Sequence, residues 1–154
     1  MDNKWLKIPL YSINNFNYYQ KKEVSLLRED ENVFRIIEYG DFKPILNQGP
    51  YLLFENQLAQ VFKNLASEQI LRYNEVEIFR QSTKEKWNNY TEIVFKTNLQ
   101  IDDFDIVDST GLKVYSFLHE SIYVTELLKN RIIESYSNAD QIAFSNDRPF
   151  LSGN

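Results

Sequence analysis

The sequence contains no cysteine, and this absence removes several classes of function at once. Disulfide bonds, thiolate catalysis, cysteine zinc sites and iron–sulfur clusters all need that side chain. A chain without cysteine is compatible with a reducing cytoplasm, and that is the location we expect. We also expect no signal peptide and no membrane contact, because the first residues lack a basic start with an apolar run, and no window approaches the roughly 18 apolar residues of a membrane helix.

Glycine and histidine are scarce, and this limits the catalytic motifs that the chain can contain. The four glycines, at positions 40, 49, 111 and 153, form neither a phosphate-cradling loop nor a dinucleotide fingerprint. The single histidine, His119, completes no HExxH zinc motif and has no Gly-x-Ser-x-Gly elbow near it. A surface or hydrogen-bonded structural histidine is the simpler interpretation. We therefore expect no enzyme activity, no catalytic residues, no metal site and no cofactor.

Basic residues are outnumbered by acidic ones, 17 to 22, which gives a formal net charge of -5. The cations form no long run, whereas phosphate backbones reward clustered cations, so we expect no nucleic-acid partner. A partner with a basic face suits the chain better. The densest acidic group comprises Asp102, Asp103, Asp105 and Asp108. It lacks the central glycine and terminal glutamate of an EF-hand loop, so a solvated, partner-facing edge is a better interpretation than a metal site.

The pattern of apolar residues predicts an α+β fold. A chain of 154 residues is most simply one domain over 1–154, with a frayed tail at 150–154. Helical spacing is expected over 55–65 and after Thr125, and a positive φ is expected at Gly111 in a turn. Strands are expected at 5–11, 33–39, 74–80, 90–95, 104–107, 113–118 and 141–144, with a loop over 12–22 and a polar connection over 81–89. We expect a mainly antiparallel or mixed sheet with two principal helices packed on one face.

Aromatic residues make up 15% of the chain, and those in the expected loop over 12–22 have two interpretations. Tyr18 and Tyr19 could form an exposed patch that binds a partner. Alternatively, Phe16 and Tyr18 could pin the loop to the core.

Short motifs follow one another in a defined order from about residue 49 to 144. They are Gly49-Pro50-Tyr51-Leu52-Leu53, the helix residues Leu58, Val61 and Phe62, Val76-Glu77-Ile78, Ile106, the Asp108/Gly111 turn, Val114-Tyr115-Ser116-Phe117, Val124-Thr125-Glu126-Leu127-Leu128-Lys129 and Ile142-Ala143-Phe144. In this order they resemble the immunity proteins of bacterial polymorphic toxin systems, a group long known only as a domain of unknown function. Residues 1–43 match least, and Asn138 and Ala139 stand where the group usually has a glycine.

The resemblance implies a cytoplasmic protein that binds a cognate toxin, expected to be basic, and blocks it stoichiometrically. It supplies no catalytic residues. Partner-facing candidates are chosen for their surface character, and they are Tyr18, Tyr19, Asp102, Asp103, Asp105, Asp108 and Glu120. Two alternatives remain at this point: a small carbohydrate-active hydrolase that uses paired carboxylates, and a non-catalytic interaction module of another kind.

Overall fold

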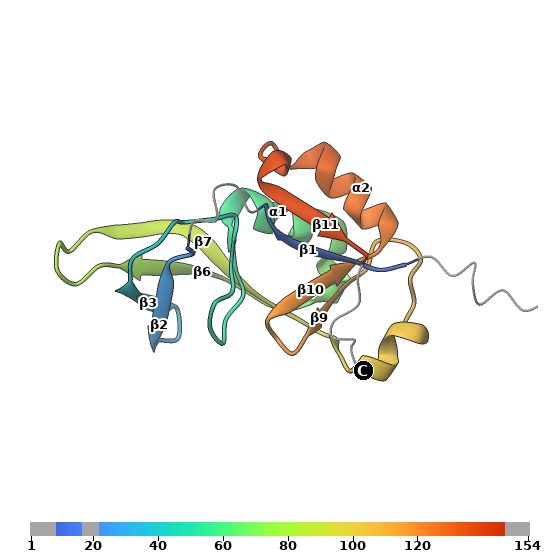
Figure 1. Cartoon of the computed structure of the whole chain (residues 1–154), viewed down its shortest axis with the longest axis horizontal. Helices are drawn as coiled ribbons and strands as arrows, with labels where there is room; N and C mark the ends of the chain where they lie inside the picture. Colours follow the sequence, from blue (N-terminus) through green and yellow to red (C-terminus); the bar gives the residue numbers. More distant parts are fainter. Residues whose placement is uncertain (1–8, 17–21, 147–154) are drawn as a thin grey trace, which may run out of the picture.

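The computed structural model describes residues 9–16 and 22–146, and within them the chain forms two sheets and two α-helices (Figure 1). The larger sheet contains β2 (Ser25–Asp30), β3 (Val33–Glu38), β4 (Ile45–Leu46), β5 (Leu53–Glu55), β6 (Ile70–Phe79) and β7 (Lys86–Phe95). The smaller sheet contains β1 (Tyr11–Asn15), β8 (Asn98–Leu99), β9 (Val114–Phe117), β10 (Ser121–Val124) and β11 (Ile142–Ser145).

Both sheets are mixed, with antiparallel pairs in the majority. The strand orders are β2-β3-β6-β7-β5-β4 and β11-β1-β10-β9-β8. The β3–β6 pair and the β8–β9 pair are parallel, and the other pairs of neighbouring strands are antiparallel. The expected α+β class is confirmed, although the strands divide between two sheets.

The helices α1 (Asn56–Ala66) and α2 (Glu126–Ser135) lie side by side on the same side of the molecule (Figure 1). Phe62 of α1 packs against Phe54 and Phe95 of the larger sheet, with ring centroids 5.4 and 5.8 Å apart. The main core also includes Leu128 of α2 and Val124 of the smaller sheet. One apolar cluster therefore connects both helices with both sheets, and its burial is a main source of stability.

The β6–β7 hairpin is longer than the sequence pattern predicts. Each of its strands has ten residues. The expected polar connection over 81–89 is wrong in its second half, because Trp87 already pairs with Ile78 inside the hairpin. The indole of Trp87 packs against Phe42, with ring centroids 5.0 Å apart. This aromatic contact stabilises strand structure in a stretch whose neighbouring residues are polar.

The first strand is displaced from its expected position. Part of the expected strand over 5–11 lies outside the described residues, and β1 covers Tyr11–Asn15. The expected loop over 12–22 is therefore wrong at its start. Ile13 is buried, and β1 pairs with β10 on one edge and with β11 on the other. Backbone pairing on both edges outweighs the weak strand propensity of the asparagines in this segment.

The expected strand over 104–107 is also wrong, because this part of the chain is a 3₁₀ helix, η3 (Ile101–Asp105), followed by a turn. Gln100 and Asp103 form a reciprocal capping box at its start. Phe104 is its one buried residue and fixes the helix to the smaller sheet. A short run that contains Asp102, Asp103 and Asp105 satisfies this capped turn better than a strand.

Candidate protein-interaction surface

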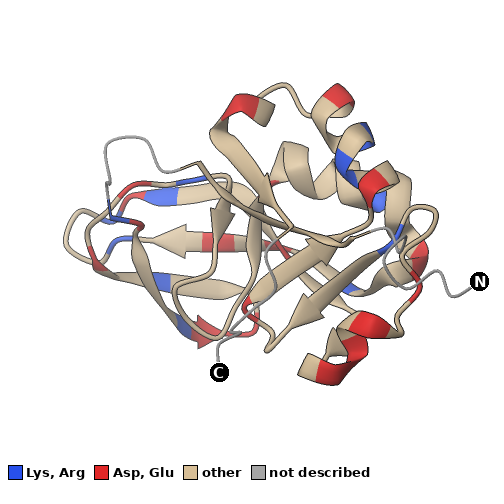
Figure 2. Cartoon of the chain, turned by 45° about the vertical axis from the view of Figure 1, so that its right-hand side comes forward, with Lys and Arg blue, Asp and Glu red and all other residues tan. Residues whose placement is uncertain are grey.

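The four aspartates of the expected site lie on one segment of the chain. Between residues 98 and 112 the sequence has four aspartates and neither lysine nor arginine. Asp102, Asp105 and Asp108 are exposed, and Asp103 is half-buried. Figure 2 shows the short helix η3 in red at the lower right of the molecule. We call this segment the η3 surface, which comprises the four aspartates and the exposed apolar residues Ile101 and Ile106.

Two of these carboxylates hold the local backbone. The backbone N–H of Gln100 donates a hydrogen bond to Asp103 Oδ2 at 2.8 Å. The hydroxyl and the backbone N–H of Thr110 donate to Asp108 Oδ1 at 2.6 and 2.9 Å. Both bonds from Thr110 lower the pKa of Asp108 below its ordinary value, because they favour the charged form, and the bond from the hydroxyl has the larger effect. Asp108 is therefore ionised at neutral pH, and the segment that carries the other aspartates keeps a defined shape.

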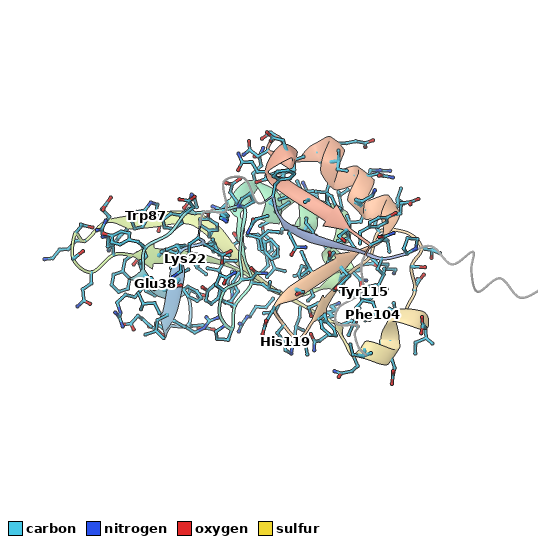
Figure 3. All side chains as sticks on the ribbon, viewed as in Figure 1. Lys22, Glu38, Trp87, Phe104, Tyr115 and His119 are labelled. Carbon is cyan, nitrogen blue, oxygen red and sulfur yellow. The ribbon has the colours of Figure 1, made fainter. Side chains whose placement is uncertain are left out.

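A buried aromatic cluster fixes η3 to the smaller sheet. The ring of Phe104 packs edge-on against Tyr123 and Phe117, with centroids 4.9 and 5.6 Å apart. The hydroxyl of Tyr115 donates to the carbonyl of Asp108 at 2.7 Å. Figure 3 labels Phe104 beside Tyr115, at the point where η3 meets β9. The η3 surface is thus presented by a packed element and not by an unsupported loop.

Exposed apolar side chains accompany the aspartates. Ile106 is 79% exposed, and Ile101 is 47% exposed. An apolar centre beside polar or charged neighbours is the usual composition of a protein interface. The sequence pattern did not identify Ile106 as a surface residue, because it placed this residue in a strand. Its apolar character alone is equally typical of the core, so the sequence carries no signal for its exposure.

The turn between β9 and β10 has an unusual backbone. Leu118 and His119 have φ values of 56° and 58°, and the N–H of Glu120 donates to the carbonyl of Phe117 at 3.2 Å. A type I′ turn requires two positive φ angles, but asparagine and glycine are the residues that normally occupy them. A leucine there is a true outlier that costs about 1–3 kcal/mol. Contacts from neighbouring elements hold the turn in this conformation, in which Leu118 is 57% exposed.

Two asparagines hold this turn from other elements. Asn98 Oδ1 accepts a hydrogen bond from the backbone N–H of His119 at 3.0 Å, and Asn47 donates to the carbonyl of Glu120 at 2.7 Å. Asn98 begins β8, which leads directly into η3. The expected site residue Glu120 is exposed in this turn, separate in sequence from the four aspartates. Tyr18 and Tyr19 lie outside the described residues.

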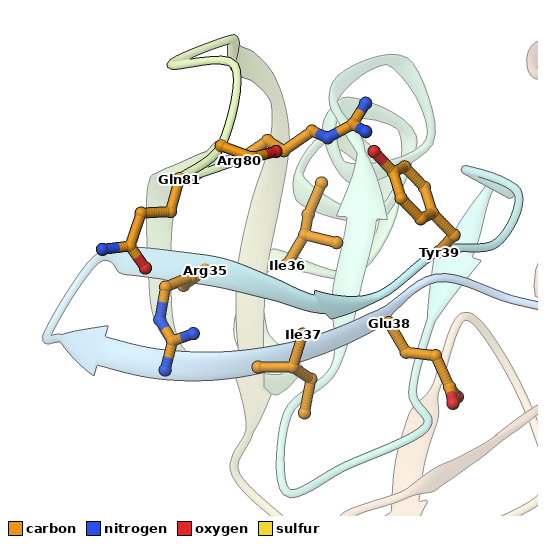
Figure 4. A pocket seen from close by; sticks show the side chains of 8 residues that line it. Arg35, Ile36, Ile37, Glu38, Tyr39, Arg80 and Gln81 are labelled. Carbon is orange, nitrogen blue, oxygen red and sulfur yellow. The ribbon is translucent and has the colours of Figure 1, made fainter.

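A second exposed area lies along β3, at a groove of about 370 Å³ (Figure 4). Ile37 and Tyr39 are exposed there, and the guanidinium of Arg80 lies 4.0 Å from the centroid of the Tyr39 ring. The described lining contains one carboxylate, Glu38, which pairs with Lys22. The charge of its lining is mixed, whereas the segment of the η3 surface has aspartates and neither lysine nor arginine in its sequence.

A hydrolase of the paired-carboxylate type needs two carboxyl groups in one cleft. Among the described residues that line the groove along β3, Glu38 is the one carboxylate. Among those that line a cavity between β7 and the β9–β10 turn, Glu92 is the one carboxylate. Neither of these two sites brings a pair together, and the hydrolase stays a prediction without structural support from them.

The described residues contain no group of three or more His, Asp or Glu side chains that could hold a metal ion. Among the helices in the described part of the chain, none is long and apolar enough to cross a membrane. The chain matches no protein-family model, no curated protein and no solved structure.

Proposed function

We propose that this protein is an immunity-type inhibitor, which binds a cognate bacterial toxin domain stoichiometrically in the cytoplasm and blocks it without chemical turnover. The ordered resemblance over residues 49–144 motivates the proposal. The structural observation that carries it is the η3 surface, where four aspartates are close in sequence to exposed Ile101 and Ile106 on an anchored element.

The η3 surface would act through charge and shape. A toxin domain that attacks nucleic acid is expected to be basic, because it must approach phosphates. Four aspartates without a nearby cation in sequence would attract such a domain and raise the association rate. Ile106 and Leu118 would then supply apolar contacts that exclude water and lower the dissociation rate. Occupation of the basic face of the toxin would prevent its substrate from binding.

The direct test is co-expression in bacteria of this chain with the toxin domain encoded beside its gene. Growth is expected when both are expressed, and killing when the toxin domain is expressed alone. Calorimetry with the two purified proteins should give a 1:1 complex and no catalytic consumption of either partner. Continued killing in the presence of the folded protein would overturn the proposal.

Charge-reversal variants test whether the η3 surface is the docking site. Asp102→Lys with Asp105→Lys should abolish protection, because two like charges would then face the basic toxin. The matched control is Glu68→Lys with Glu134→Lys, which reverses two exposed charges near the ends of α1 and α2. The control should protect as the natural protein does. Equal loss in both variants would show a general charge effect and not a docking site.

A further inference from the structure

A partly enclosed cavity of about 210 Å³ lies between the larger sheet and the β9–β10 turn. The charged and polar side chains of its described lining come from distant parts of the sequence. They are Arg28 on β2, Arg72 on β6, Glu92 on β7, Ser116 on β9 and His119 in the turn that follows β9. The fold therefore brings two guanidinium groups and one carboxylate to a single small volume, and this volume is distinct from the η3 surface.

Glu92 is the central group of this cavity, and one of its oxygens has no hydrogen bond. The residue is 4% exposed. Its Oε2 accepts a hydrogen bond from Arg28 Nη2 at 2.5 Å. Its Oε1 is buried and has no hydrogen-bond donor among the described residues. Arg72 Nη2 lies 3.8 Å from Oε1, which is too long for a hydrogen bond. A buried carboxyl oxygen without a donor points to a missing partner.

Strand register places Arg72 and Glu92 on the same face of the hairpin. Arg72 is directly opposite Val94, and Asn74 is directly opposite Glu92, so the two charged residues are diagonal neighbours. Tyr90 lies on this face too, two residues before Glu92 along β7, and it belongs to the apolar cluster of the larger sheet and not to the main core under α1. The carboxylate thus lies on the face of the sheet that is turned away from α1.

The two arginines differ in how firmly they are held. Arg28 donates to Glu92 and also, through Nη1, to the carbonyl of Glu31 at 2.5 Å, and its guanidinium lies 4.6 Å from the centroid of the Phe34 ring. Arg72 is 46% exposed, and its contact with Glu92 is the long one. Arg28 is therefore the fixed counter-charge of Glu92, whereas Arg72 can turn toward a ligand at the rim of the cavity.

We propose that this cavity binds a small zwitterion of the α-amino-acid type. The ammonium group donates to Glu92 Oε1, the carboxylate accepts from Arg72, and an aliphatic side chain lies against Pro50, Tyr51 and Val94 of the lining. A ligand with only a positive charge would face two guanidinium groups, and a ligand with only a negative charge would leave Glu92 Oε1 without a donor. In a zwitterion, each of the two charges has its own partner in the cavity. The volume equals that of about seven waters, enough for a small amino acid.

Ligands matched in shape test the requirement for both charges. The binding of L-leucine is measured by calorimetry and by NMR shifts of the backbone amides of Ser116, His119 and Glu92. We expect saturable shifts with L-leucine. 3-Methylbutylamine lacks the carboxylate and 4-methylpentanoate lacks the ammonium group, and each should bind at least tenfold more weakly, because each leaves a charged group of the site unpaired. Absence of binding of L-leucine, or equal binding of the amine, would overturn the proposal.

A variant pair locates the binding in the cavity. Arg72→Gln should weaken binding of L-leucine at least tenfold while the NMR spectrum remains that of a folded protein. The matched control is Arg35→Gln, since Arg35 lies on β3 and pairs with Glu29 on the surface. The control should bind L-leucine unchanged. Unchanged binding in Arg72→Gln would overturn the proposal. So would the absence of shifts with L-leucine, which would mean that Arg72 closes onto Glu92 and that the cavity is a structural ion-pair network. This inference does not depend on the proposed immunity function.

Discussion

Carboxylates occupy two opposite environments in this molecule, outside on the η3 surface and inside the larger sheet or beside it. Asp102 and Asp105 are exposed and lie on a segment without nearby basic residues in sequence. Glu23 and Glu92 are buried and accept hydrogen bonds from backbone amides or from arginine. Under the proposed function the same chemical group steers a partner in one place, whereas it determines stability in the other, because water screens the exposed charges and not the buried ones.

Loss of the Glu92 carboxylate should have the largest effect. Glu92→Ala leaves Arg28 without its counter-charge on the face of the sheet that Glu92 shares with Tyr90. Removal of one partner of a buried pair is strongly destabilising, and we expect a loss of about 3 kcal/mol in the free energy of unfolding. Urea denaturation measures it. The matched control is Glu75→Ala, an exposed residue of β6, which should change stability by less than about 0.5 kcal/mol. Equal costs would show that Glu92 is not a structural charge.

The second effect concerns Glu23, whose burial raises its pKa to about 6 despite hydrogen bonds from the backbone amides of Asn47 and Gln48. The ordinary pKa is 4.5, so the folded state binds the proton more tightly than the unfolded state does. The stability that Glu23 contributes is therefore present below pH 4.5 and is lost as pH rises through about 6. The loss amounts to about 2 kcal/mol.

Glu23→Gln isolates this contribution. The free energy of unfolding of the natural protein minus that of the variant should fall between pH 4.5 and 6 and be flat above pH 7. Titratable groups that both proteins share cancel in this difference. A difference that is flat over the whole range would contradict the raised pKa of Glu23.

Sequence patterns identified the helices and the main turn, since these depend on neighbours in sequence. The spacing of Leu58, Val61 and Phe62 predicts α1, and Gly111 has the expected positive φ, 71°. The buried carboxylates could not be predicted in this way. Glu92 meets an arginine 64 residues away in sequence, and no local pattern marks it. The error at η3 has a related cause, because a run of four residues is too short to distinguish a strand from a capped turn.

The β9–β10 turn offers a smaller effect that separates stability from binding. Asparagine tolerates the positive φ that Leu118 adopts, so Leu118→Asn should stabilise the fold by about 1 kcal/mol. The same variant removes an exposed apolar side chain that the proposed docking uses, and it should weaken binding to the toxin domain. Thermal unfolding and calorimetry measure the two changes. A variant that is more stable but binds equally well would show that the strained turn has no part in docking.

The smallest effect on stability is expected on the η3 surface itself, where the comparison with Glu92 is sharpest. Asp102→Asn removes one exposed charge and should change the free energy of unfolding by less than about 0.5 kcal/mol. The association rate with a basic toxin domain should nevertheless fall severalfold at low salt. In stopped-flow experiments at rising salt concentration, the association rates of the natural protein and of the variant should become equal, because ions screen exposed charges. A rate difference that persists at high salt would mean that Asp102 makes a direct contact with the partner and does more than steer it.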